Sequence, residues 1–253
     1  MNNDFLLLLK KLNFWKKYNL CWIPSTASTN DDLKDIWRSE GFEHTIEVAD
    51  VQTRGKGQYD RKWASDEVGQ CLMFSFTVDV KEYFFPISMI AGISLAAALE
   101  NMGVNAKDFW LKWPNDIWFN NRKLAGILTE STTFNGGFRT VVGIGINILP
   151  LQDKSINAAS LSEAGLSTNR EEVLFEFCKA WDKIFILSAS EQTELWKKYG
   201  GQFWKREMTI ALPKGETLVA VPESVEKDGA LIVRKKDGSL QKIISATLLP
   251  KIL

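Results

Sequence analysis

Two segments carry the side chains best suited to chemistry on a small anionic substrate. The first, Val51–Trp63, has glycines at positions 55 and 57 and four basic residues against one acid. Glycines at i and i+2 allow backbone N–H groups to point at one anion. The segment is consistent either with phosphate or carboxylate binding or with a solvated basic loop. It matches neither the P-loop pattern nor GxGxxG, so the usual nucleotide motifs are absent from it.

The second segment, Lys112–Glu130, is typical of two strands around a tight turn. That arrangement brings together the polar side chains of Lys112, Asn115, Asp116 and Lys123. A lysine in an apolar strand is costly unless it meets an anion, and a carboxylate such as Asp116 can hold Mg²⁺ together with phosphate oxygens. The alternative for Lys112 and Asp116 is a structural ion pair at a strand end.

Glycines mark two places where a side chain would obstruct a neighbour. Gly126 in the second segment would allow a ligand to approach the backbone. The apolar strand Val142–Ile148 contains Gly143 and Gly145 and carries Asn147 near its end. Because glycine weakens a strand interior, either a neighbouring group needs the space or the sheet packs unusually tightly. The Asn147 amide would then be placed to read an adenine edge.

A fourth group, Ser28-Thr29-Asn30, is followed by Asp31 and Asp32. A Ser or Thr cap with acids in the first turn is a helix start. As a cap the group needs no further explanation. Spare donors and acceptors at such a helix start can also face a ligand.

Hydrophobic periodicity predicts the elements that must position these segments. Helices are expected from the N-terminus through Trp15 and at 28–41, 86–102, 173–184 and 191–199. Strands are expected at 46–51, 72–78, 109–113, 117–119, 124–129 and 141–146. From about Phe203 the chain changes to short strands at 208–212, 217–225, 230–235 and 240–247, with two Asp-Gly turns. We therefore expect two domains, 1–203 and 204–253, the second a small β-barrel.

Composition limits the classes of function. The chain has 253 residues and a formal net charge of zero, which disfavours nucleic acid as the main partner. Three cysteines without a CxxC pair and a single histidine disfavour a disulfide framework, a zinc site and a Ser-His-Asp triad. The early apolar run Phe5–Leu9 is too short for a signal core or a membrane span. A reducing cytoplasm fits this cysteine usage.

The four segments, in this order, resemble the biotin protein ligase family. The family shows an STN-like element, a QTxGxG-basic-W loop, a KWPND…KxxGIL hairpin and a GIGIN strand, which match 28–30, 52–63, 112–128 and 143–147. The KWPND and KLAGIL elements are the most specific. The resemblance covers about residues 25–150 and extends to the C-terminal module. It implies an α+β fold, a mixed β-sheet with helices on one face like class II aminoacyl-tRNA synthetases, plus a C-terminal SH3-like barrel.

The resemblance also implies roles for individual residues. The biotin-binding positions would be Ser28, Thr29, Asn30, Gln52, Lys56, Gly57, Gln58, Lys123 and Gly126. The ATP-binding positions would be Arg61, Trp63, Lys112, Asn115, Asp116 and Asn147. Lys123, Lys56 and Asp116 would serve catalysis, with Asp116 also a candidate ligand of Mg²⁺. Gln58 stands where the family usually has arginine, and Asp60 replaces a glycine, so altered ligand affinity or adenylate retention is expected.

The implied activity uses ATP and Mg²⁺ to convert biotin to biotinyl-5'-AMP, then transfers biotin to a lysine of a biotin carboxyl carrier protein. A cytoplasmic enzyme is expected, with no membrane association and with a homodimer as an open alternative. Only 27 residues precede Ser28, too few for the DNA-binding domain of some members, so no DNA binding is expected. The alternatives are a lipoate or octanoate ligase, whose RRxSGG-like segment is absent, and a non-catalytic biotin-binding homologue, supported only by Gln58 and Asp60.

Overall fold

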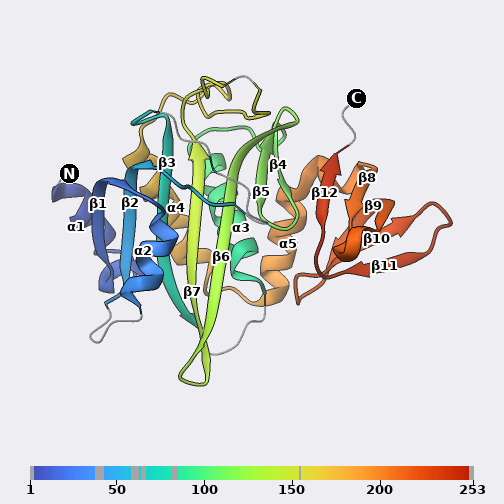
Figure 1. Ribbon diagram of the computed structural model, residues 1–253, viewed down its shortest axis with the longest axis horizontal. Coiled ribbons are helices and arrows are strands. Elements are labelled where there is room, and N and C mark those ends of the chain that lie inside the picture. Colours follow the sequence, from blue (N-terminus) through green and yellow to red (C-terminus); the bar gives the residue numbers. More distant parts are fainter. Residues whose placement is uncertain are drawn as a thin grey trace.

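The computed structural model describes residues 3–37, 43–57, 63, 67–80, 85–153 and 155–250. Its larger part contains a seven-stranded sheet in the order β1-β2-β3-β7-β6-β5-β4 (Figure 1). The strands are β1 (Asn19–Thr26), β2 (Thr45–Gln52), β3 (Cys71–Val80), β4 (Phe109–Lys112), β5 (Asp116–Phe119), β6 (Arg122–Phe134) and β7 (Gly137–Asn147). β1 and β2 run parallel and the other neighbouring pairs are antiparallel. The predicted mixed sheet is therefore confirmed.

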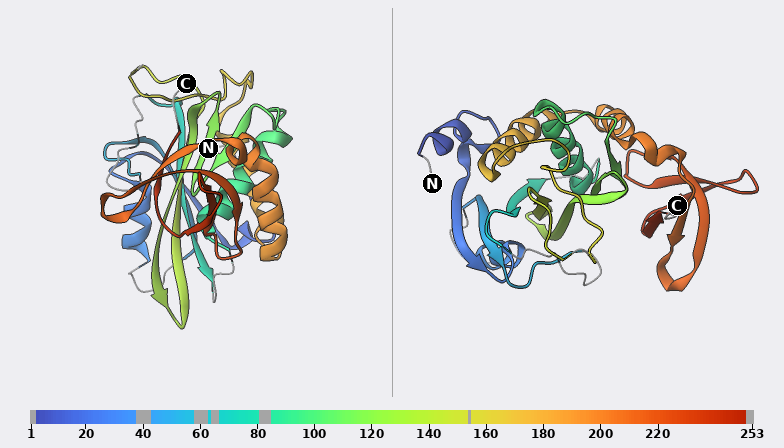
Figure 2. Two further views of the ribbon diagram at one scale, coloured as in Figure 1. Left: turned by 90° about the vertical axis from the view of Figure 1, so that its right-hand side faces the viewer. Right: turned by 90° about the horizontal axis from the view of Figure 1, so that it is seen from above.

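Three longer helices, α3 (Ile87–Asn101), α4 (Arg170–Ile184) and α5 (Ala189–Gly200), lie on one side of the sheet, with α1 (Asn3–Leu9) beside α4 (Figure 2). α3 is buried on nearly every side because it lies between the sheet and α4. The short helix α2 (Thr29–Ile36) lies on the opposite face (Figure 1). The expectation of helices on one face only is therefore wrong for α2. It is the crossover between two parallel neighbours, and the right-handed sense of such crossovers fixes its face.

The N-terminal region differs from the prediction in two ways. The expected helix through Trp15 ends at Leu9, and a 3₁₀ turn, η1 (Trp15–Lys17), follows. Trp15 is nevertheless buried, and its indole N–H donates to the carbonyl oxygen of Cys178 at 2.8 Å. β1 was not predicted, because its mixed burial at the sheet edge gives no clean alternation of apolar and polar residues.

The C-terminal module is a five-stranded antiparallel sheet in the order β11-β10-β9-β8-β12. Its strands are β8 (Met208–Ala211), β9 (Thr217–Val225), β10 (Leu231–Lys235), β11 (Leu240–Ile243) and β12 (Thr247–Pro250). The strand expected at 240–247 ends at Ile243, and a second strand, β12, begins at Thr247; β11 pairs with β10 whereas β12 pairs with β8. Within the described residues β11 and β12 do not pair, so the sheet is open and closure into a barrel is not confirmed.

The module meets the main sheet through the turn before β10. The indole N–H of Trp113 donates to the carbonyl oxygen of Gly229 at 2.8 Å. Gly229 has φ +80°, and a Cβ there would lie 2.1 Å from Cγ of Pro86, at the start of α3. The turn therefore fits only as glycine. In the described part of the chain, no helix is both long and apolar enough to cross a membrane.

Candidate functional site

A cavity of about 50 Å³ opens on the face of the sheet that carries α2. Most of the residues predicted to bind biotin line it, together with two of the predicted ATP-binding residues: Ser28, Thr29, Asn30, Gln52, Lys56, Gly57, Trp63, Asn115, Lys123 and Gly126. Gln58 and Arg61 lie outside the described residues. The sequence analysis missed five further lining residues, Phe74, Ser75, Ile127, Leu128 and Ile144. For Phe74 and Ser75, the only signal in the sequence was the apolar alternation that predicted a strand at 72–78.

The two glycines of β7 make room for two residues of the cavity. A Cβ at Gly143 would lie 2.1 Å from Oδ1 of Asn30, and one at Gly145 would lie 2.4 Å from the ring of Trp63. Real Cβ atoms do not approach other atoms so closely. The space predicted beside these glycines is therefore filled by side chains of the protein itself, one polar and one aromatic.

A β-bulge brings Lys123 to the cavity. Asp116 pairs with Gly126, and Trp118 pairs with Lys123, with a register shift between them that leaves Leu124 as the extra residue. Residues three apart in a regular strand point to opposite faces. The bulge removes that difference, and the Lys123 side chain covers Gly126, where a Cβ would lie 2.8 Å from the lysine Nζ. Gly126 thus leaves space for Lys123.

Asp116 lies between two lysines. Its carboxylate is 2.7 Å from Nζ of Lys123 and 4.0 Å from Nζ of Lys112. Nζ of Lys112 also lies 4.6 Å from the ring centroid of Trp118, and Nζ of Lys123 lies 5.8 Å from that of Trp63. The closer ion pair of Asp116 is therefore with Lys123, and the Lys112 side chain is buried under the site.

The fit of this region to Mg²⁺ is limited. Among the described residues no group of three His, Cys, Asp or Glu side chains is arranged to hold a metal ion. Asp116 is already paired with Lys123. Mg²⁺ is commonly held by one or two carboxylates and by substrate phosphates, so any ion here would take most of its ligands from the nucleotide and water. The role of Asp116 toward Mg²⁺ stays a prediction.

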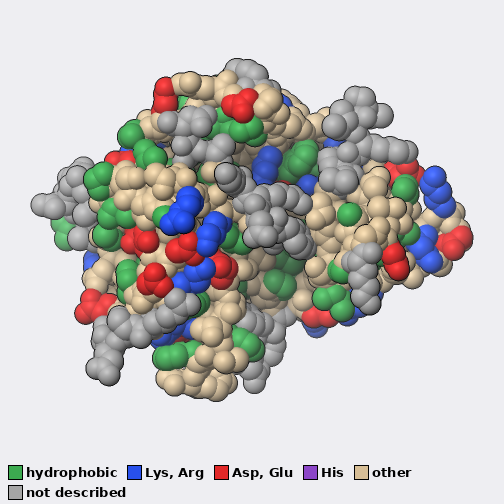
Figure 3. Space-filling model, viewed as in Figure 1, with side chains coloured by type: hydrophobic (Ala, Val, Ile, Leu, Met, Phe, Trp, Pro, Cys, Tyr) green, Lys and Arg blue, Asp and Glu red, His purple; other side chains and the backbone are tan. Residues whose placement is uncertain are grey.

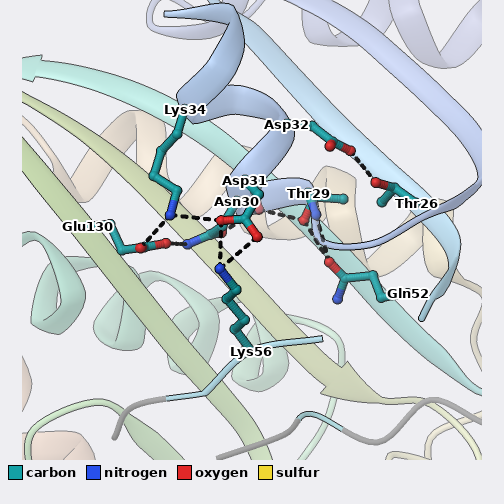
Figure 4. Close-up of polar contacts among 10 residues, drawn as sticks. Thr26, Thr29, Asn30, Asp31, Asp32, Lys34, Gln52, Lys56 and Glu130 are labelled. Atoms are coloured by element: carbon teal, nitrogen blue, oxygen red, sulfur yellow. Dashed lines mark hydrogen bonds and ion pairs between the residues drawn. The ribbon is translucent and has the colours of Figure 1, made fainter. Parts of the chain in front are cut away.

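A continuous chain of polar contacts joins α2 to β2, β3 and β6 (Figure 4). Oε1 of Gln52 accepts from the backbone N–H of Thr29 at 2.8 Å and lies 3.1 Å from Oγ1 of that residue. Oγ1 of Thr29 lies 2.6 Å from Oγ of Ser75, which lies 2.6 Å from Oδ1 of Asn30. Nδ2 of Asn30 donates to Glu130 at 2.8 Å. The predicted biotin-binding amides and hydroxyls thus form one connected set.

At Glu130 the hydrogen-bonded chain continues into a group of ion pairs. Lys34 pairs with Glu130 at 2.6 Å and with Asp31 at 2.8 Å, and Lys56 pairs with Asp31 at 2.6 Å. Burial acts to raise the pKa of Asp31, but its hydrogen bonds to the two lysines outweigh that effect and lower the pKa below its ordinary value. Figure 3 shows acidic and basic side chains gathered over α2 and the adjoining strands, and Figure 4 shows how Asp31, Lys34, Lys56 and Glu130 face one another. Lys56 is therefore held against the start of α2.

Two predicted residues sit at ends of elements. Ser28 is the N-cap of α2 and is buried, yet its side chain makes no capping hydrogen bond. Nδ2 of Asn115 donates to the carbonyl oxygen of Ile127 at 2.5 Å, which holds the turn before β5 against β6. The Ser28 hydroxyl is therefore not used for capping, whereas the Asn115 amide shapes the backbone of the site.

Asn147 was predicted to read an adenine edge, and the structure uses its amide inside the protein. Nδ2 donates to the carbonyl oxygen of Ala159 at 2.9 Å, and Oδ1 accepts from the thiol of Cys71 at 3.3 Å. Ala159 in turn donates its N–H to the carbonyl oxygen of Lys123 at 2.9 Å. We therefore interpret Asn147 as a residue that holds the segment beside Lys123, which the sequence analysis did not identify.

Comparison with known proteins finds relatives that are named as biotin or lipoate protein ligases. The model of the biotin/lipoate A/B protein ligase family matches residues 22–147. The structure of a biotin protein ligase from Aquifex aeolicus, in complex with biotin and ATP, is similar with a TM-score of 0.75 and 28% identity, over 92% of this chain and 99% of that one. The bifunctional ligase/repressor BirA of Bacillus spizizenii is 30% identical over 241 residues, 89% of this chain and 71% of that protein.

A plant relative matches over a shorter stretch. The biotin–protein ligase 2 of Arabidopsis thaliana is 30% identical over 177 residues, which are 66% of this chain and 53% of that protein. The chain thus spans about half the length of the Arabidopsis relatives it matches. The Aquifex aeolicus and Bacillus spizizenii matches, in contrast, extend through most of both chains.

Proposed function

This chain belongs to the biotin/lipoate A/B protein ligase family, and from that membership we propose that it is an ATP-dependent biotin ligase. It would activate biotin as biotinyl-5'-AMP and transfer the biotinyl group to a lysine of a biotin carboxyl carrier protein. One observation carries the proposal. Side chains suited to a cyclic urea (Thr29, Asn30 and Gln52) and a lysine ammonium, that of Lys123, line the same cavity. Relatives named as biotin protein ligases support this substrate.

In the first step a carboxylate oxygen of biotin attacks the α-phosphorus of ATP. A new P–O bond forms, the bond to the β-phosphate oxygen breaks, and pyrophosphate leaves. Two anions must approach each other, and fixed positive charge at their meeting point lowers that barrier. Lys123 supplies this charge. Its pairing with Asp116, at 2.7 Å, holds the ammonium over Gly126 in the absence of substrate.

In the second step the amine of the carrier lysine attacks the carbonyl carbon of the mixed anhydride. An amide bond forms, the bond from the acyl carbon to the AMP oxygen breaks, and the amine nitrogen loses a proton. This sequence needs no covalent intermediate on the enzyme. Trp63 and Asn115, which line the cavity, and Lys112 and Asp116 beside them are proposed to border ATP. Mg²⁺, when bound, would neutralise phosphate charge near Asp116.

The C-terminal residues 204–253 are proposed as a second unit that supports ligation, and their assignment as an SH3-like barrel stays a prediction. The hydrogen bond between Trp113 and Gly229 supports this role, because it ties the unit to the segment that carries Asn115 and Asp116. A cytoplasmic location, a carboxylase carrier as acceptor and a possible homodimer remain predictions. Relatives named biotin–[acetyl-CoA-carboxylase] ligase favour that acceptor.

The proposal is tested by incubating the protein with biotin, Mg-ATP and an apo carrier domain, followed by mass spectrometry of the carrier. A gain of one biotinyl group at the acceptor lysine is expected. A parallel reaction contains lipoate and an apo lipoyl domain, and a known biotin ligase on the same carrier serves as the positive control. A lipoyl gain alone would establish the sister activity instead. Bound biotinyl-5'-AMP without transfer would favour a non-catalytic homologue.

A further inference from the structure

The main chain of Lys123 is paired with a short segment that follows β7. The ladder between β6 and β7 ends at Ala125, before it reaches Lys123. Beyond that end, the N–H of Lys123 donates to the carbonyl oxygen of Asn157 at 3.2 Å, and its carbonyl oxygen accepts from the N–H of Ala159 at 2.9 Å. Both backbone polar groups of the lysine are therefore directed to residues 157–159, which take the place of β7.

This pairing matters because Lys123 borders the β-bulge of β6. A bulge disrupts the regular ladder and re-aims a side chain, so regular strand geometry does not set where the lysine points. Its ammonium lies 2.7 Å from the carboxylate of Asp116 and covers Gly126. Residues 157–159 thus fix the main chain from which the proposed catalytic side chain extends.

Arg122 ties this segment to β6. Its Nη1 donates to the carbonyl oxygen of Ala158 at 3.1 Å and lies 2.9 Å from Oε1 of Glu163. The other carboxylate oxygen of Glu163 accepts from the N–H and the hydroxyl of Ser160, at 3.0 and 2.9 Å. Burial acts to raise the pKa of Glu163, but its hydrogen bonds to Arg122 and Ser160 outweigh that effect and lower the pKa below its ordinary value. Glu163 is therefore charged at neutral pH, and it connects Arg122 to the far end of the segment.

Packing holds the outer side of this segment poorly, because Asn157 is exposed and, with Ala158, lines a cavity of about 200 Å³. We propose that Arg122 is a positioning residue for adenylate formation: by holding the segment against Lys123, it keeps the lysine ammonium over Gly126. The inference rests on the proposed function and deepens it, because it states how the charge at the reacting groups is held in place. Arg122 acts here through the main chain of Lys123.

The experiment compares two variants of Arg122. Arg122→Met removes both contacts of Nη1, whereas Arg122→Lys can keep them, because one nitrogen makes both and an ammonium has three donors. Single-turnover pyrophosphate release is expected to slow by about 10–100-fold in Arg122→Met, as when a reacting group is misplaced, and to recover in Arg122→Lys. Biotin affinity, measured by calorimetry, is expected to stay within about twofold.

Arg234→Met is the matched control for loss of an arginine. Arg234 likewise pairs with a glutamate, Glu223, at 2.6 Å and donates to a backbone carbonyl oxygen, that of Gly238, at 3.2 Å. It lies on β10, outside the segment beside Lys123. Its loss is expected to leave the rate of pyrophosphate release unchanged.

Hydrogen exchange measured by NMR tests the contact independently of the chemistry. The amide protons of Lys123 and Ala159 are expected to exchange about tenfold faster in Arg122→Met, because local opening of the segment becomes easier. The amide protons of β10 serve as the reference. Glu163→Gln covers the case in which Arg122→Met fails to fold, because it removes the ion pair with little change of shape, and it is expected to affect rate and exchange in the same direction.

Slower chemistry without faster exchange, or faster exchange without slower chemistry, would overturn the positioning role of Arg122. A raised KM for ATP with an unchanged rate at saturation would overturn it as well, since Arg122 would then bind the nucleotide. If the wild type releases no pyrophosphate with biotin, the proposed function itself fails, while exchange at Lys123 still tests the contact. The two failures are thus distinguishable.

Discussion

The indole N–H of Trp113 donates to the carbonyl oxygen of Gly229 across 2.8 Å, and this bond joins the main sheet to the C-terminal module. Trp113 immediately precedes the segment that carries Asn115 and Asp116. A Cβ at Gly229 would lie 2.1 Å from Cγ of Pro86, so the turn passes close to the start of α3. The C-terminal module is thus joined, through Trp113, to the chain segment that carries the predicted ATP-binding residues Asn115 and Asp116.

Trp113→Phe is expected to destabilise the protein and to slow adenylate formation. The change leaves the buried Gly229 carbonyl without its donor, which costs about 1–3 kcal/mol. Trp118→Phe is a matched control, since the Trp118 indole N–H has no hydrogen-bond partner in the described part of the chain. Urea unfolding and biotin-dependent pyrophosphate release of both variants check this. Equal losses in the two variants would contradict a role for the bond.

Ser28→Ala is expected to weaken biotin binding by about tenfold with a stability change within about 0.5 kcal/mol. The Ser28 hydroxyl lines the cavity but does not cap α2. Ser188 caps α5 and accepts from the N–H of Glu191, so Ser188→Ala is expected to cost about 1 kcal/mol and to leave biotin affinity unchanged. Thermal unfolding and calorimetry separate the two. A stability loss in Ser28→Ala as large as that in Ser188→Ala would show a capping role.

Gly143→Ala is expected to reduce biotin affinity by at least about tenfold because its Cβ would displace the Asn30 amide, 2.1 Å away. The same change at Gly92, in α3, meets only atoms at 3.4 Å or more and serves as the control for added bulk. Calorimetric titration with biotin measures both. An unchanged affinity in Gly143→Ala would mean that the position of Asn30 is not needed for binding.

Lys123→Met is expected to slow pyrophosphate release by about 10²–10³-fold, the size found when one charge-stabilising group is lost from a site. Biotin affinity should fall less, because the ureido-binding side chains remain. Lys179→Met, which breaks a half-buried ion pair with Glu176 on α4, is the control for loss of a lysine. Single-turnover kinetics measure the chemical step. A variant that loses affinity and rate to the same extent would assign Lys123 to biotin binding alone.

Stability is expected to fall as pH rises through neutrality because of Glu47, which lies on β2 under α2. Burial, together with the neighbouring Asp32 carboxyl, raises the pKa of Glu47 from 4.5 to about 8. The folded state therefore holds this proton more tightly than the unfolded state. Its stabilising effect is complete below pH 4.5 and is lost between pH 4.5 and 8. Glu47→Gln should flatten that slope in urea unfolding; an unchanged slope would place the effect elsewhere.

Much of the site was predictable because its residues stand in specific motifs. The segments around Thr29, Gln52, Lys123 and Gly143 do meet at one cavity. The positions of side chains within it were not predictable. Glu130 lies 100 residues from Asn30 in sequence, so nothing local indicates their contact.

The bulge at Leu124 was equally hidden, because regular alternation would place Lys123 and Gly126 on opposite faces. The strand expected at 240–247 failed for a related reason. Only 240–243 form a strand, β11, which pairs with β10, whereas β12 begins at Thr247 and pairs with β8; pairing partners are set by tertiary structure. Local pattern therefore predicted which residues gather at the cavity better than it predicted which way their side chains point.

The polar contacts of Asn30 join residues that lie far apart in the sequence, and this affects the order in which the protein can fold during synthesis. Asn30 emerges from the ribosome early, but its partner Glu130 and the neighbouring Gly143 emerge a hundred or more residues later. Long-range pairings of this kind form late because loop closure precedes their stabilising contacts. A nascent chain that ends before β7 therefore lacks the cavity, and ligand binding reports completion of the whole sheet.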